Sequence, residues 1–204
     1  MKISSRTNFK LRPHDFLASW ESNDRKYFRQ ALVLMSELEL LCEEVRSKWP
    51  VAPGEPIKVA ITNYPVLYQL VDNRDRTSDL VRIYSAMAVE GFLNRYGVLR
   101  LGQDIFNAHF ERLNILEKLK MLFLVCDSIV IKNSDSLSVA LQSIAESRNA
   151  LVHPKPREIS ELSSIPQKFS KVPQTARDTV KNMELFFSEF IIAIPAATIL
   201  IPKT

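Results

Sequence analysis

Apolar residues recur along most of the chain at the three- and four-residue spacing of an amphipathic helix, and no stretch alternates convincingly as a surface strand does. Polar caps, glycines and prolines mark where these patterns begin and end. They predict five helices, over residues 23–48, 77–97, 113–126, 135–153 and 174–194. Residues 57–71 fit a short strand or a packed irregular segment equally well. The pattern therefore predicts an all-α fold, a bundle of about five helices.

The same spacing identifies the side chains that each helix should bury. The helix over residues 77–97 is expected to bury Leu80, Tyr84, Met87 and Gly91. In the helix over 113–126, the inward residues are expected to be Leu116, Leu119, Leu122 and Phe123, and the outward ones Glu117, Lys118 and Lys120.

The composition excludes several classes of protein. At 204 residues the chain is expected to form a single helical domain over 1–204. It has only four glycines and neither a GxGxxG pattern nor a Walker loop, so no nucleotide cofactor is expected. No His, Cys, Asp or Glu cluster has metal-ligand spacing, so no metal is expected either.

Cysteine placement and the apolar tail bear on the compartment. Cys42 and Cys126 both lie within helical patterns and no apolar signal segment follows the polar start, which predicts a reducing cytoplasm. The apolar stretch over 185–201 is interrupted by Glu189 and Pro195, so we expect a buried or dimer-facing helix and no membrane span. The net charge of +4 would favour a polyanionic partner only mildly.

One arginine interrupts an apolar stripe. Counting from Leu137 through Leu141 and Ile144, the next position on that face is Arg148. A guanidinium in an apolar seam needs an anionic partner. The expected partner is Glu90, which lies four residues before Asn94 at the edge of the second helix's apolar stripe.

The residues after Arg148 suit phosphoryl chemistry. Arginine can clamp phosphate oxygens, Asn149 can orient a neighbouring group, and His153 can exchange protons near neutral pH. On a regular helix Arg148 and His153 would point about 140° apart. Pro154 can loosen the last turn and let them converge, and Lys155 and Arg157 add positive charge beyond it.

A purely structural interpretation uses the same residues. Arg148 would be a buried arginine satisfied by Glu90, Asn149 a helix-end hydrogen-bonding group, and His153 a C-terminal cap. Residue chemistry alone favours this interpretation.

The run Arg148-Asn149-Ala150-Leu151-Val152-His153 resembles the signature of the HEPN superfamily (higher eukaryotes and prokaryotes nucleotide-binding), in which four to six residues separate an arginine from a histidine. The stretch over 86–94, which reads AMAVEGFLN, is similar to an earlier helix of many members, where a glutamate faces the motif. The resemblance covers residue 77 to the C-terminus. Residues 1–76 are then an N-terminal helical extension of unknown role.

The resemblance implies a HEPN-like bundle over 77–204, usually a homodimer, and in many members a metal-independent endoribonuclease. His153 would be the general base or acid, Arg148 the phosphate clamp, Asn149 the orienting group, and Glu90 the residue that holds Arg148. Asn94, Lys155 and Arg157 would bind the RNA. Many members are toxins or phage-defence effectors with an antitoxin or another partner protein. Others are non-catalytic dimers that bind a nucleotide or a protein, and that alternative stays open.

Overall fold

The computed structural model describes residues 23–48, 65–153 and 165–202, and these residues form helices with no β-strand among them. The helices are α1 (Asp24–Lys48), α3 (Pro65–Leu101), α4 (Gln103–His109), α5 (Ile115–Asp127), α6 (Ser136–Val152), α7 (Ile165–Ala193) and the 3-10 helix η3 (Pro195–Leu200). The fold is an all-α helical bundle, as the apolar spacing predicts.

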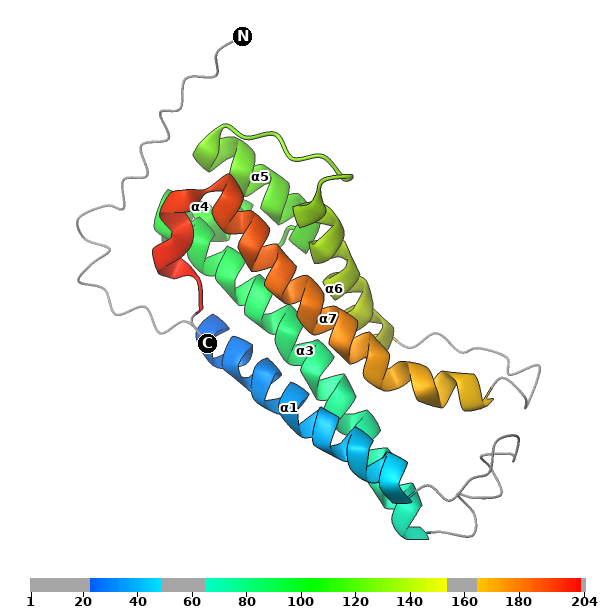
Figure 1. Cartoon of the computed structure of the whole chain (residues 1–204). Coiled ribbons are helices and arrows are strands. Elements are labelled where there is room, and N and C mark those ends of the chain that lie inside the picture. Colours follow the sequence, from blue (N-terminus) through cyan, green and yellow to red (C-terminus); the bar gives the residue numbers. More distant parts are fainter. Residues whose placement is uncertain (1–22, 49–64, 154–164, 203–204) are drawn as a thin grey trace.

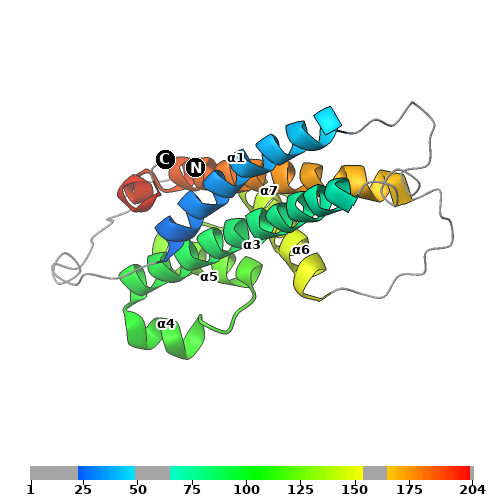
Figure 2. The same ribbon diagram turned by 90° about the horizontal axis from the view of Figure 1, so that it is seen from below.

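Helix α3 lies at the centre of the bundle. It packs against α1, α4, α5, α6 and α7. Figure 1 shows α1, α3 and α7 running side by side, with α5 and α6 behind them. Figure 2 shows that α4 lies on the side of α3 that faces away from α1. Since α3 is covered on several sides, polar side chains along it need partners on other helices.

The observed helix boundaries agree best with the predicted ones where the sequence has clear capping residues. Helices α1 and α6 match their predicted ranges closely. Helix α3 begins at Pro65, well before residue 77, so the part of the ambiguous segment from 65 to 71 is helical; residues 57–64 lie outside the described residues. Helix α7 begins at Ile165, before the predicted start at residue 174, and carries Pro173 inside it. Helices α4 and η3 were not predicted because both are too short to show a full apolar period.

The predicted boundary between residues 76 and 77 falls inside α3. Side chains of α1, such as Phe28 and Leu38, belong to the same apolar core as those of α3 and α7. The described part of the N-terminal segment is therefore integral to the bundle.

Aromatic rings fill the centre of this core. Phe92 of α3 makes edge-to-face contacts with Phe187 and Phe190 of α7, with ring centroids 5.2 and 4.9 Å apart. Phe190 also meets Phe123 of α5 at 5.0 Å. Edge-to-face contacts contribute about 0.5–1.5 kcal/mol each beyond their buried area. These rings fix α3, α5 and α7 relative to one another.

Two arginines near the C-terminal end of α3 bind the ends of other helices. Arg95 donates to Asp24 Oδ2 over 2.6 Å at the start of α1 and to the carbonyl of Leu200 in η3. Arg100 donates to Asp127 Oδ1 over 2.6 Å and to the carbonyl of Cys126, both in the last turn of α5. Guanidinium groups satisfy carbonyls that a helix end leaves unpaired.

Tyr96 completes the buried cluster at the end of α5. Its hydroxyl donates to Asp127 Oδ2 over 2.5 Å and accepts from Arg100 over 2.7 Å. Burial, together with the Asp127 carboxylate, raises the pKa of Tyr96 far above its usual range, so the phenol stays protonated.

A third arginine of α3, Arg82, occupies the seam beside α6 in which Arg148 was expected. Its Nε donates to Ser147 Oγ over 2.9 Å and its Nη2 to the Ser147 carbonyl over 2.6 Å, while Nη1 meets Asp79 at 3.1 Å. Ser147 Oγ also lies 2.8 Å from Thr179 Oγ1 of α7. The prediction that Arg148 is buried is wrong: its side chain is exposed.

Two other burial predictions also fail. In α3, Leu80 is 42% exposed whereas the next residue, Val81, is fully buried, so the buried stripe is displaced from the predicted one. In α5, Lys118 was placed outward but is buried at 1% exposure. Its Nζ lies over the ring of Phe106 because α4, which the sequence did not reveal, covers that side.

The apolar tail forms the end of α7 and η3, where Phe186, Phe190 and Leu200 are buried in the core. Among the described residues, no helix combines the length and apolar character that crossing a bilayer requires.

The two arginines beside α6 give a matched pair for testing these assignments. Arg82→Ala should lower the free energy of unfolding by about 2–3 kcal/mol, because it removes buried charge-assisted hydrogen bonds. Arg148→Ala should change it by no more than about 0.5 kcal/mol, since its side chain is exposed. Urea denaturation followed by circular dichroism measures both. Equal losses would mean that Arg148 is buried in solution.

Gly97 lets α4 fold closely against α3. A Cβ atom at this position would lie 2.5 Å from ring carbons of Phe106 and 3.0 Å from Leu122 Cδ2. Neither neighbour can move far, because both are buried. This close approach explains a glycine within a long helix, where it otherwise costs about 1 kcal/mol relative to alanine.

Gly97→Ala should therefore lower the free energy of unfolding by about 1–2 kcal/mol, because overpacking outweighs the gain in helix propensity. The double variant Gly97→Ala with Phe106→Leu should recover part of that loss, because leucine leaves room for the added methyl group. Thermal unfolding of both variants tests this, and a stabilised single variant would contradict the close packing.

Candidate functional site

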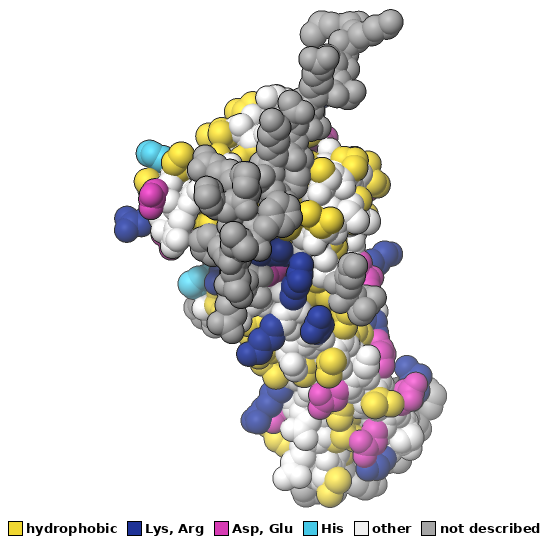
Figure 3. All heavy atoms as spheres, turned by 90° about the vertical axis from the view of Figure 1, so that its left-hand side faces the viewer, with side chains coloured by type: hydrophobic (Ala, Val, Ile, Leu, Met, Phe, Trp, Pro, Cys, Tyr) yellow, Lys and Arg dark blue, Asp and Glu magenta, His cyan; other side chains and the backbone are white. Residues whose placement is uncertain are grey.

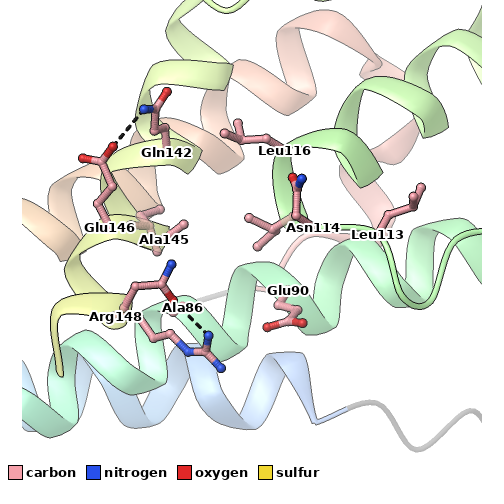
Figure 4. Close-up of a pocket in the computed structure, with 12 residues that line it drawn as sticks. Ala86, Glu90, Leu113, Asn114, Leu116, Gln142, Ala145, Glu146 and Arg148 are labelled. Atoms are coloured by element: carbon pink, nitrogen blue, oxygen red, sulfur yellow. Dashed lines mark hydrogen bonds between the residues drawn. The ribbon is translucent and has the colours of Figure 1, made fainter. Parts of the chain in front are cut away.

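A cavity of about 450 Å³ opens between α3, the start of α5 and the C-terminal half of α6. Figure 4 shows residues of α6 on one side, residues of α5 on the other and those of α3 below. Twelve residues line it: Ala86, Glu90, Leu113, Asn114, Ile115, Leu116, Gln142, Ile144, Ala145, Glu146, Arg148 and Asn149. Its size is in the range of small-molecule sites.

Arg148 and Asn149 reach this cavity from α6. Both side chains are exposed, and Arg148 Nη1 donates to Asn149 Oδ1 over 3.1 Å. Ile144, one turn earlier, is fully buried. The fully buried part of the apolar stripe of α6 therefore ends at Ile144, and Arg148, one turn later, lies on the cavity.

Glu90 lines the same cavity from α3, so the structure brings it together with Arg148 and Asn149. Figure 4 shows its carboxylate and the Arg148 guanidinium along the same side of the cavity. The expected ion pair is not formed: no hydrogen bond or salt bridge joins these two described side chains, and Glu90 is exposed. In this structure Glu90 does not hold Arg148.

His153 caps α6 and does not line the cavity. Its backbone N–H donates to the carbonyl of Asn149 over 2.9 Å, and its imidazole is exposed. Helix α6 stays regular through Val152, so the last turn does not loosen as Pro154 suggested. Arg148 and His153 are both accessible to solvent, but the expected convergence on one small volume is not observed.

Asn94, which was expected to bind substrate, is engaged inside the bundle. Its Oδ1 accepts a hydrogen bond from Lys118 Nζ over 2.7 Å. Burial lowers the pKa of Lys118, and the nearby carboxylates of Glu90 and Glu111 oppose that shift. Lys118 and Glu90 are thus close enough for their charges to interact.

Lys155 and Arg157 lie outside the described residues. Within the described part, positive charge is not confined to the cavity. Figure 3 shows several Lys and Arg side chains near the middle of the face on the left of Figure 1, with acidic ones below them. The first two turns of α1 carry the exposed residues Arg25, Lys26 and Arg29.

The contribution of α5 to the site was not predicted. Asn114 caps this helix, and its Oδ1 accepts from the backbone N–H of Glu117 over 3.0 Å. An asparagine followed three residues later by glutamate is a recognisable helix start. That signal could have placed the start of α5 at the correct residue. It could not have shown that this start faces α6, because the contact is between distant segments.

Two further polar residues of α6 lie on the cavity. Gln142 Nε2 donates to Glu146 Oε1 over 2.8 Å, one turn apart (Figure 4). The cavity therefore carries two carboxylates, one guanidinium and three amides beside an apolar wall. Such a lining can bind a ligand that presents both hydrogen-bond donors and acceptors.

Neither a metal centre nor a reactive thiol is found in the part of the chain that the structure describes. No group of three or more His, Cys, Asp and Glu side chains there is arranged to hold a metal ion. Burial raises the pKa of the Cys126 thiol to about 11, so it is a poor nucleophile at neutral pH.

Comparison with known proteins gives no relative from which a function could be transferred. No family model matches the chain, and neither a curated protein nor a solved structure matches it. The residues of the cavity and the Arg148–His153 motif at the end of α6 are therefore the features that indicate a function.

Proposed function

We propose that the protein is a metal-independent endoribonuclease of the HEPN type, which cleaves RNA by attack of a ribose 2′-hydroxyl on the adjacent phosphate. The observation that carries this proposal is the grouping of Arg148, Asn149 and Glu90 around one cavity, with the exposed imidazole of His153 at the end of the same helix.

The proposed reaction takes place at the C-terminal end of α6. His153 accepts the proton of the 2′-hydroxyl, the 2′-oxygen bonds to phosphorus, and the bond to the 5′-oxygen breaks. The leaving oxygen takes up a proton, so the products are a cyclic phosphate and a 5′-hydroxyl. Arg148 binds the phosphate oxygens as negative charge develops on them, and Asn149 orients the guanidinium through their 3.1 Å hydrogen bond.

Because His153 lies outside the cavity, the proposed RNA strand runs from the cavity across the end of α6. In the proposed homodimer, the ends of two α6 helices share one groove, and Lys155 and Arg157 add phosphate contacts. A toxin or phage-defence role in the cytoplasm, opposed by an antitoxin or another partner protein, accords with this chemistry.

One observation favours a second candidate, a non-catalytic helical dimer that binds a nucleotide or a protein. His153 is absent from the cavity lining, and its backbone already caps α6. A ligand could then occupy the cavity without meeting a general base. The two candidates differ in what loss of the imidazole does to a folded protein.

Incubation of the full chain with single-stranded RNA tests the proposal. Cleavage should persist in the presence of a chelator and stop with a 2′-deoxy substrate, because the nucleophile is then missing. His153→Ala should slow cleavage by about 100-fold or more, the typical contribution of general acid–base catalysis. Arg148→Ala should slow cleavage by a similar factor, because it removes the group that stabilises the negative charge developing on the phosphate.

His109→Ala is the matched control, since His109 is also exposed but lies at the end of α4, outside the cavity lining. It should leave the rate unchanged. If His153→Ala stays folded and cleaves as fast as the wild type, His153 is not the catalytic base. If no RNA is cleaved under any condition, the binding-module alternative replaces the nuclease.

A further inference from the structure

The cavity has more hydrogen-bonding capacity than a phosphate needs. Beside Arg148 it presents the Glu90 carboxylate, whose two oxygens accept no hydrogen bond from any described residue. Lys118 is close enough to interact with this carboxylate, but both carboxylate oxygens remain open to a ligand that offers N–H donors. The part of the cavity near Glu90 is therefore suited to a portion of a nucleotide other than its phosphate.

The other polar groups of the cavity have unused donors and acceptors too. Asn114 uses its Oδ1 to cap α5, which leaves its Nδ2 donors available. Gln142 uses its Nε2 to reach Glu146, which leaves its Oε1 as an acceptor. Together with Glu90, these groups form a mixed donor and acceptor set.

Apolar side chains enclose the same space. Leu113, Ile115 and Leu116 contribute from the α5 side, and Ala86 and Ala145 contribute from α3 and α6. Figure 4 shows Leu116 and Asn114 across an open space from Ala145, with Glu90 below. A flat ring with hydrogen-bonding edges, such as a nucleobase taken out of a stack, suits an apolar recess with polar groups at its rim.

We propose that this cavity binds a guanine base and that Glu90 is the residue that selects it. The Watson–Crick edge of guanine places the N1–H and N2–H donors side by side, which matches the two oxygens of one carboxylate. Adenine and cytosine offer a single amino group next to an acceptor, and uracil offers one N–H between two carbonyls. Guanine is the only one of the four bases with adjacent donors on this edge.

Asn114 and Arg148 complete the recognition. The Nδ2 group of Asn114 can donate to guanine O6, and Arg148 can bind the phosphate attached to the same nucleoside. The inference deepens the proposed function, because in an RNA strand the selected base would be adjacent to the scissile phosphate. A free guanine nucleotide has the same chemistry, so the test includes both sources.

The first arm of the test is a calorimetric titration of the full chain with the 5′-monophosphates of guanosine, adenosine, cytidine and uridine. The guanosine nucleotide should bind at least about tenfold more tightly than the other three, which is the low end of what a two-point side chain-to-base contact contributes. Inosine 5′-monophosphate, which lacks the 2-amino group, should lose most of that advantage. Equal affinity for all four nucleotides would overturn the inference.

Glu90→Gln is the second arm, because it keeps the shape of the side chain and replaces one acceptor by a donor. It should reduce the preference for guanine about tenfold. Glu184→Gln is the matched control: Glu184 is an exposed glutamate on α7 outside the cavity lining, and its loss should not alter the preference. A Glu90→Gln variant with unchanged guanine preference would contradict the role of Glu90.

The third arm separates the inference from the nuclease proposal. Single-stranded RNAs that differ only by guanosine or adenosine at one position are incubated with the wild type. Preferred cleavage beside guanosine supports both proposals. Tight binding of the guanosine nucleotide without any cleavage supports the guanine site and removes the nuclease, whereas cleavage without base preference keeps the nuclease and removes the guanine site.

Discussion

Three arginines of α3 hold the rest of the bundle in position. Each is almost completely buried, with side chains 10–11% exposed, and each donates to a group on another helix. Arg82 binds the Ser147 carbonyl of α6, Arg95 binds the start of α1 and the end of η3, and Arg100 binds the last turn of α5. A buried guanidinium without such partners would be strongly unfavourable, so these contacts dictate how the helices can dock.

The aromatic core provides the apolar part of the same arrangement. Phe92 and Tyr96 lie on α3 between Arg82 and Arg100, and their rings pack against α7. Apolar packing tolerates small shifts, whereas charge-assisted hydrogen bonds require defined directions. The rings therefore supply most of the attraction between α3 and α7, and the arginines specify the positions of α5, α6 and α1.

Much of the fold follows from the sequence, because helical periodicity and caps are local signals. The range of α6, its start at Asp135 or Ser136 and its end at His153 could all be predicted. The error at Arg148 has a different origin. Periodicity shows which face a residue occupies, but whether that face meets another helix depends on contacts between distant segments. Arg82 of α3 occupies the space between α3 and α6, where it binds Ser147, and the next residue of α6, Arg148, is exposed.

The candidate site was predictable to a similar extent. The motif from Arg148 to His153 and the position of Glu90 follow from the sequence, and the structure places Arg148, Asn149 and Glu90 on one cavity. The apolar wall from α5 and the engagement of Asn94 by Lys118 could not be predicted, whereas the absence of His153 from the cavity lining agrees with the divergence expected of a regular helix. The apolar wall and the Asn94 contact depend on how α4 and α5 fold back on α3, which a glycine at 97 and the turn at Gly102 make possible.

The three walls of the cavity belong to α3, α5 and α6, and α3 itself secures the other two through Arg100 and Arg82. Arg82 holds α6 at Ser147, directly beside the cavity, whereas Arg100 holds α5 at the end away from the cavity. The position of the α6 wall of the cavity is therefore set by a buried, charge-assisted contact that forms when the chain folds. The shape of the α6 wall thus depends on a contact that is itself outside the cavity lining, because Arg82 is not among the residues that face the open space.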